Sequence, residues 1–155
     1  MERPSLEQMR EAYRSGLRRS EAGRARNGKH RYGWSPKPEE QRVIDAESAV
    51  AELVVASALG RKWLSDGLEP DKPGYGDVEG GISVRWTPRM NGSLIVHEDE
   101  SDELISVLVV GNAPNHEVKG WVQNYEAKAP NYWRTDVRHP AFFVPQEALR
   151  PLETL

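Results

Sequence analysis

Three residues in one short stretch could do chemistry together: Asp77, Ser83 and Arg85. The stretch predicts two short strands joined by a glycine-rich turn at 79–81. Residues two apart in a strand share a face, so Ser83 and Arg85 should lie on one side and the apolar side chains on the other. A three-residue loop places Asp77 on the Arg85 face, whereas a two-residue loop would place it on the apolar face. A carboxylate facing a cation is either a catalytic site or an ordinary cross-strand ion pair.

Glu52 is a second candidate acid, because it stands inside an apolar run. Residues 38–63 predict a helix, with Pro38 in its first turn and Gly60 as its C-terminal cap. The run 49–59 is apolar nearly all round, so the helix should be buried on more than one face. A carboxylate there needs a partner, a metal or a proton. Alternatively, Glu52 points along a polar seam to solvent or to an arginine.

The first third of the chain is basic, although the net charge of the whole chain is -3. Residues 4–20 predict a helix, with Ser5 as its N-cap and Gln8 completing a capping box. Arginines at four-residue spacing should form a cationic ridge on this helix: Arg10, Arg14 and Arg18.

Residues 21–37 have no periodicity and predict a loop or arm in which cations alternate with rings. Such a mixture suits a nucleic-acid strand or a duplex backbone, although the rings could equally attach the arm to the body. The candidate nucleic-acid contacts of the helix and the arm are Arg14, Arg18, Arg24, Arg26, Lys29, Arg31, Tyr32 and Trp34.

The rest of the chain predicts short strands, and the most apolar of them, 104–110, should be central. Residues 129–140 predict a loop, and 141–145 predict an edge strand. We therefore expect an α+β or α/β fold with a mixed sheet of four or five strands and the 38–60 helix packed on it. The domain organisation expected is a basic helix and arm at 1–37 and a core domain at 38–155.

Composition bounds the class of protein. The chain has 155 residues, of which 37% are hydrophobic and 29% charged, and it has no cysteine. Disulfides and thiolate metal sites are excluded. No apolar run approaches the roughly 20 residues that cross a bilayer, so we expect a soluble cytoplasmic protein without a membrane partner.

The order of these features resembles the PD-(D/E)xK nuclease superfamily, which has a restriction-endonuclease-like fold. Residues 51–63 look like its core helix with a glutamate, residues 77–78 look like its metal-binding aspartate, and residues 83–85 occupy the place of its Glu-x-Lys triplet. The later strands resemble small phage-encoded members. The resemblance covers roughly residues 38–150 and depends on order and spacing more than on a dense motif.

The resemblance implies hydrolysis of DNA phosphodiesters with Mg²⁺ or Mn²⁺. Asp77 would be the bridging metal ligand, Glu52 would hold the metal directly or through water, and Arg85 would stand in place of the lysine. Glu79 could serve as a migrated metal ligand, or it could be a solvent-facing turn residue.

Two departures from the family pattern bear on activity. Ser83 replaces the acid of the triplet, and Arg85 replaces its lysine; arginine stays protonated and cannot act as a base, although it can bind phosphate. Activity could therefore be weakened or lost. The alternative is a catalytically inactive relative that binds nucleic acid or a host protein.

A histidine followed by acids is a weaker candidate site. His97 precedes Glu98, Asp99 and Asp102 and could bind a cation with them, but the spacing is not diagnostic and predicts a solvated turn. His116 and His139 fall in separate loops, and nothing in the sequence places them together.

Overall fold

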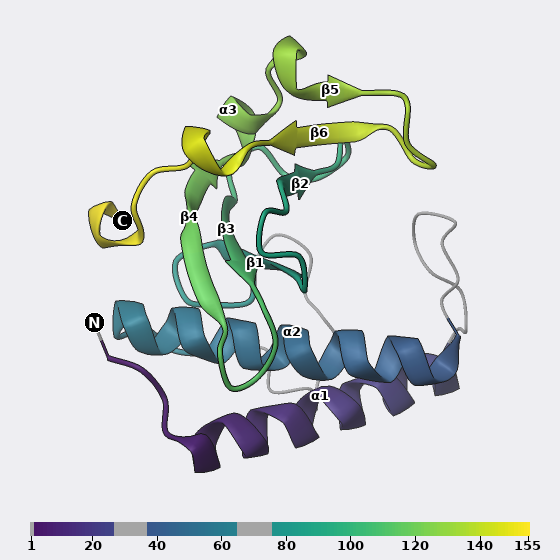
Figure 1. Cartoon of the computed structure of the whole chain (residues 1–155), viewed down its shortest axis with the longest axis vertical. Coiled ribbons are helices and arrows are strands. Elements are labelled where there is room, and N and C mark those ends of the chain that lie inside the picture. The colour runs from purple at the N-terminus through teal and green to yellow at the C-terminus, as the bar shows by residue number, and fades with distance from the viewer. Residues whose placement is uncertain (1, 27–36, 65–75) are drawn as a thin grey trace.

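Two long helices lie side by side next to the first of two small sheets in the computed structural model, which describes residues 2–26, 37–64 and 76–155 (Figure 1). The helices are α1 (Leu6–Arg26) and α2 (Pro38–Leu59). Helix α2 lies between α1 and the first sheet, and buries Val50 and Val54 toward α1 but Ala51 and Val55 toward the sheet. The prediction that this helix is buried on more than one face is confirmed.

Helix α1 begins, and helix α2 ends, where local chemistry predicts. The loop predicted from residue 21 is wrong for residues 21–26, because α1 continues to Arg26. The Ser5 backbone N–H donates to Oε1 of Gln8 at 2.8 Å, and the Gln8 backbone N–H donates to Oγ of Ser5 at 3.1 Å, which completes the predicted capping box. Gly60 ends α2 with φ of 64°, a left-handed conformation that favours glycine. The residues Met9 and Ala12 then pack α1 onto α2.

The first sheet contains β1 (Ile82–Thr87), β3 (Ile105–Val110) and β4 (Glu117–Gln123), in the order β1-β3-β4. Strand β1 pairs in parallel with β3, and β3 pairs antiparallel with β4. The prediction that the most apolar strand is central is confirmed for this sheet. Val107 and Val109 of β3 pack on the α2 side, while Leu108 and Val110 pack on the opposite side.

The second sheet is antiparallel and contains β2 (Leu94–Val96), β6 (Ala141–Val144) and β5 (Trp133–Arg134), in the order β2-β6-β5. The prediction of one sheet with four or five strands is therefore wrong, since the chain forms two sheets of three. The strand expected at the edge, β6, is central, and β5 lies in the expected loop. Strand β3 is apolar on both faces, so its second face needs a cover, and residues of the second sheet provide it.

Short helical turns connect and close these strands: α3 (Asn124–Ala127), η1 (Pro130–Tyr132), η2 (Gln146–Ala148) and η3 (Leu152–Thr154). None of the described helices combines the length and apolar composition that a membrane-spanning helix requires.

A buried His–Glu pair fixes the loop after β3 to α2. Nε2 of His116 lies 3.0 Å from Oε2 of Glu47, and the same carboxylate oxygen accepts the backbone N–H of Ala113 at 3.0 Å. Burial lowers the pKa of His116, while the negative charge of Glu47 acts in the opposite direction. The sequence placed His116 in a loop with no partner; its partner is a helix residue far earlier in the chain.

Candidate functional site

Glu52 lies on α2 and is almost fully buried, with 4% of its surface exposed. Both of its carboxylate oxygens accept from the guanidinium of Arg19, at 3.2 Å each, and Oε1 also accepts from the indole N–H of Trp63 at 3.0 Å. The sequence left open whether Glu52 meets a partner, a metal or a proton, or instead points to solvent or to an arginine. In the structure Glu52 points to an arginine. That arginine comes from α1.

Asp77 lies in the short hairpin that precedes β1. Val78 pairs with Ile82, so the loop contains the three residues that the sequence predicted. The Asp77 backbone N–H donates to the Ile82 carbonyl at 2.7 Å, and Oδ2 of Asp77 accepts the backbone N–H of Val84 at 2.8 Å. The carboxylate of Asp77 therefore caps the edge of β1.

Glu52 and Asp77, which we call the acid pair, are electrostatically coupled. Burial, and after it the charge of Asp77, raises the pKa of Glu52 to about 8, although Arg19 and Trp63 favour its ionised form. Burial acts to lower the pKa of Arg19, but the charges of Glu52 and Asp77 hold it above its usual value. Two acids thus share one guanidinium.

Arg85 does not join the acid pair. The neighbours Val84 and Trp86 pack on the α2 side of the sheet, so Arg85 faces the other side, as alternation along a strand requires. There its Nη1 lies 2.6 Å from Oε1 of Glu100. The expectation that Asp77 and Arg85 face one another is therefore wrong: Asp77 turns to the edge of β1 and toward α2, and Arg85 pairs with a different acid.

Ser83 and Glu79 contribute no oxygen to the acid pair. Ser83 shares the Arg85 face of β1, as predicted, and Glu79 is exposed in the turn, where its backbone N–H donates to the Lys62 carbonyl at 2.9 Å. Within the described ranges, no three His, Asp or Glu side chains come together as a cation site. The oxygens of Glu52 are also engaged by Arg19 and Trp63, so the residues in this arrangement do not fit a magnesium or manganese ion.

Two of the predicted nucleic-acid contacts lie on the exposed face of α1. Arg14 and Arg18 are exposed, and both approach Glu11, at 3.1 Å and 3.8 Å respectively. Arg10 is exposed on the same helix. The other predicted contacts cannot be placed. The side chains of Arg24 and Arg26 are not described, and four residues fall wholly outside the described ranges: Lys29, Arg31, Tyr32 and Trp34.

The residue that the sequence reading missed is Arg19. It adjoins the predicted ridge at Arg18 but points inward, with 17% of its side chain exposed against 46% for Arg18. A signal was present, because the small residues Ala12, Ser15 and Gly16 precede it at three- and four-residue spacing and are buried. A stripe of small residues marks the face of a helix that packs closely, and Arg19 continues that stripe.

A second polar cluster lies between the two sheets. Glu100 binds Arg85 through one oxygen and accepts the backbone N–H of His97 through the other, at 2.9 Å. The rings of His97 and His139 lie 5.4 Å apart, so His139 neighbours His97 rather than His116. Burial lowers the pKa of His97, and the charge of Arg85 adds to this effect. This cluster joins β1 to the loops of the second sheet.

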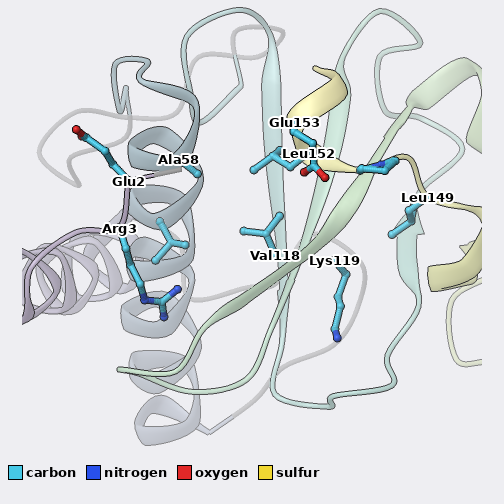
Figure 2. A pocket seen from close by; sticks show the side chains of 10 residues that line it. Glu2, Arg3, Ala58, Val118, Lys119, Leu149, Leu152 and Glu153 are labelled. Carbon is cyan, nitrogen blue, oxygen red and sulfur yellow. The ribbon is translucent and has the colours of Figure 1, made fainter.

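A groove of about 420 Å³ lies apart from both clusters. Figure 2 shows side chains from α2, from β4 and from the two ends of the chain along it, with Arg3, Lys119 and Glu153 among them. Neither Glu52 nor Asp77 lines it. The groove therefore adds no residue to the acid pair.

Comparison of the chain with family models, with curated proteins and with solved structures gave no match. A function for this protein therefore has to be inferred from its own side chains. Those that carry the inference are the acid pair, Arg19 and the exposed arginines of α1.

Proposed function

We propose that this chain is a nuclease-like protein that binds nucleic acid through the exposed face of α1. The proposal rests on the position of α1. Its outer face exposes Arg10, Arg14 and Arg18, and its inner face contacts the acid pair. Arginines spaced along one helix face match a phosphate backbone, which supplies most of the affinity of non-specific nucleic-acid binding.

Binding is favoured over hydrolysis by the partners of the charged groups. Metal-dependent hydrolysis of a phosphodiester needs carboxylate oxygens that are free for the metal, and a cation close to the reacting phosphate. Here Glu52 is bound by Arg19, and Arg85 is bound by Glu100 on the other side of the sheet. This arrangement supports the inactive, nucleic-acid-binding alternative better than the catalytic one.

Neutralising the α1 ridge is expected to weaken DNA binding. Changing Arg10, Arg14 and Arg18 to Gln removes three cations, which should cost at least about tenfold in affinity and reduce the salt dependence by about 2 to 3 in the log–log slope. Fluorescence anisotropy with a labelled duplex and a labelled single strand, between 50 and 200 mM salt, measures both quantities.

The matched control for the ridge variant removes the same charge elsewhere. Lys62, Arg89 and Arg138 are exposed and lie outside α1, so changing all three to Gln should leave most of the affinity. An equal loss in both triple variants would mean that net charge, rather than the ridge, governs binding, and would contradict the proposal.

A second candidate function is divalent-metal-dependent cleavage of DNA. Two observations favour it: two acids far apart in sequence converge, and the pKa of Glu52 is strongly raised, as occurs at functional sites. This candidate requires Arg19 and Trp63 to release the oxygens of Glu52, because only then could Asp77 and Glu52 hold Mg²⁺ or Mn²⁺. The metal would supply charge neutralisation and an activated water.

Cleavage is tested with Asp77→Asn, which keeps a side-chain oxygen to accept the N–H of Val84. If the acid pair is catalytic, we expect plasmid nicking in Mg²⁺ or Mn²⁺ to fall at least about 100-fold in this variant, because a charged metal ligand is lost. Gel electrophoresis of supercoiled plasmid measures the product. Equal nicking by both proteins would exclude the acid pair as the site, and no nicking by either would leave binding as the function.

A further inference from the structure

We propose that an apolar pocket beside α1 takes an unpaired nucleobase, so that the nucleic acid bound by this helix is single-stranded. The inference rests on the proposed function, because it names the kind of nucleic acid that the α1 ridge binds. The pocket is a surface apart from the acid pair, and binding there requires no movement of α1.

The pocket lies between α1 and the loop that joins β3 to β4, and its volume is about 330 Å³. Small-molecule sites have volumes from roughly 300 to 1,000 Å³, so the pocket has room for one base. Apolar and aromatic side chains provide most of its lining, and none of the described lining residues is acidic. These residues are Leu6, Met9, Arg10, Tyr13, Ala113 and Pro114.

The helical repeat places the lining residues of α1 on one face. Leu6, Arg10 and Tyr13 follow at steps of four and three residues, and side chains at these spacings are neighbours on a helix. Met9 lines the pocket from the core side, because it is buried against α2, while Leu6 is 61% exposed. An exposed leucine beside a half-buried tyrosine leaves apolar surface that a flat ring could cover.

The opposite wall of the pocket is fixed before any ligand binds. The Pro114 carbonyl accepts from Nη2 of Arg3 at 2.9 Å, and the Ala113 backbone N–H donates to Oε2 of Glu47 at 3.0 Å. These bonds attach the loop to the residues before α1 and to α2. A wall that is already ordered lowers the conformational cost of binding.

Arg10 gives the pocket its preference for charge. It is exposed and pairs with no acid among the described residues, whereas Arg14 and Arg18 both approach Glu11. Arg10 thus belongs both to the pocket and to the α1 ridge, which continues with Arg14 about 6 Å farther along the helix axis. A cation beside an apolar pocket complements a nucleotide, whose phosphate is anionic and whose base has an apolar face.

Only an unpaired base suits such a pocket. In a duplex each base is stacked on its neighbours and paired at its edge, so it can enter a pocket only if it is extruded, which costs free energy. Proteins that bind single strands combine cations for the backbone with aromatic side chains for the bases. Arg10, Arg14 and Tyr13 supply both kinds of group on one helix.

The first test compares oligothymidylate of about ten nucleotides with an abasic oligonucleotide of the same length, which keeps the phosphates but lacks the bases. Fluorescence anisotropy with the full chain should show at least about fivefold tighter binding of oligothymidylate, the lower end of what one base–aromatic contact contributes. Leu6→Ser and Tyr13→Ala should each remove most of this preference.

The outcomes of this test separate the pocket from the proposed function. Equal affinity of the wild type for the two oligonucleotides would overturn the pocket, while the proposed function would stand because the phosphates still bind. If neither oligonucleotide binds, the proposed function fails and the pocket assignment fails with it.

Matched controls change the same residue types away from the pocket. Leu64 is 41% exposed and Tyr125 is 63% exposed, and neither lines the pocket. Leu64→Ser and Tyr125→Ala should therefore keep the wild-type preference for oligothymidylate, and an equal loss in these controls would contradict the assignment. Leu6 is an exposed side chain, so Leu6→Ser keeps the test decisive even if Tyr13→Ala does not fold.

The position of the base is tested by the methyl signal of Met9 in carbon-edited NMR, assigned by its loss in Met9→Leu. The ring current of a base in the pocket should shift this signal when oligothymidylate is added, and the abasic oligonucleotide should leave it in place. An unmoved signal, with binding shown by anisotropy, would overturn the inference. It would also be overturned if Leu6→Ser lowered the sedimentation coefficient of a self-associated chain, because a second copy would then cover the pocket.

Discussion

The wild type is expected to lose much of its stability as pH rises, and replacing Glu52 with glutamine is expected to remove this loss. The pKa of Glu52 is about 8 in the folded chain, against an ordinary value of 4.5 in the unfolded chain. Between these values the unfolded chain releases a proton that the folded chain keeps, so the free energy of unfolding falls as pH rises through this window. The loss amounts to about 4 kcal/mol between pH 4.5 and pH 8, and it is absent in Glu52→Gln, which does not titrate.

Denaturant unfolding of both proteins at pH 5, 6.5, 8 and 9 measures this difference. The histidines His97 and His116 have lowered pKa values and change stability in the opposite direction below pH 6.5, but they do so equally in both proteins. Glu79→Gln is the matched control, because Glu79 is exposed and should follow the wild type. Parallel profiles of the wild type and Glu52→Gln would show that Glu52 is ionised in the folded chain throughout.

Gly16→Val is expected to lower the free energy of unfolding by about 3 kcal/mol, the upper part of the range for overpacking a close contact. A Cβ atom at Gly16 would lie 2.4 Å from Cα of Ala46 and 2.4 Å from the carbonyl oxygen of Asp45. Both are backbone atoms of α2, so the side chain cannot be accommodated by a rotamer change. In an exposed helix the loss of a glycine would instead favour the helix.

Chemical unfolding of Gly16→Val and Gly16→Ala, with Glu11→Ala as an exposed control on the same helix, tests this contact. Alanine should be less harmful than valine, and the control should change stability by no more than about 0.5 kcal/mol. A gain of stability in Gly16→Ala would mean that α1 and α2 do not approach one another so closely in solution.

Local pattern was enough to predict several elements of this chain. The capping pair Ser5 and Gln8, the αL cap Gly60 and the three-residue hairpin loop are each specified by residues a few positions apart. The apolar run at 104–110 likewise marked β3 as a central strand. In each case the physical cause acts over one turn of helix or one strand, so the sequence contains it in full.

The second sheet was not predictable in this way. Strand β5 has two residues and β2 has three, which is too short for a periodicity to show. Strand β6 lies between them because β2 and β5 pair with its two edges. Which strands pair at an edge depends on residues that are far apart in the sequence. The alternation in β1 did place Arg85 on the face opposite Val84, but only the tertiary structure supplied Glu100 as its partner.

The sequence by itself determined the long buried helix with an acid inside it, the hairpin with a second acid, and the basic first helix. Only the tertiary structure decided that Glu52 and Asp77 lie together, that Arg19 is the cation between α1 and this acid pair, and that Arg85 belongs elsewhere. The reason is physical: periodicity along a helix or strand tells which face a side chain is on. The partner of a buried charge is chosen by how separate elements pack, and no pattern within one element records that.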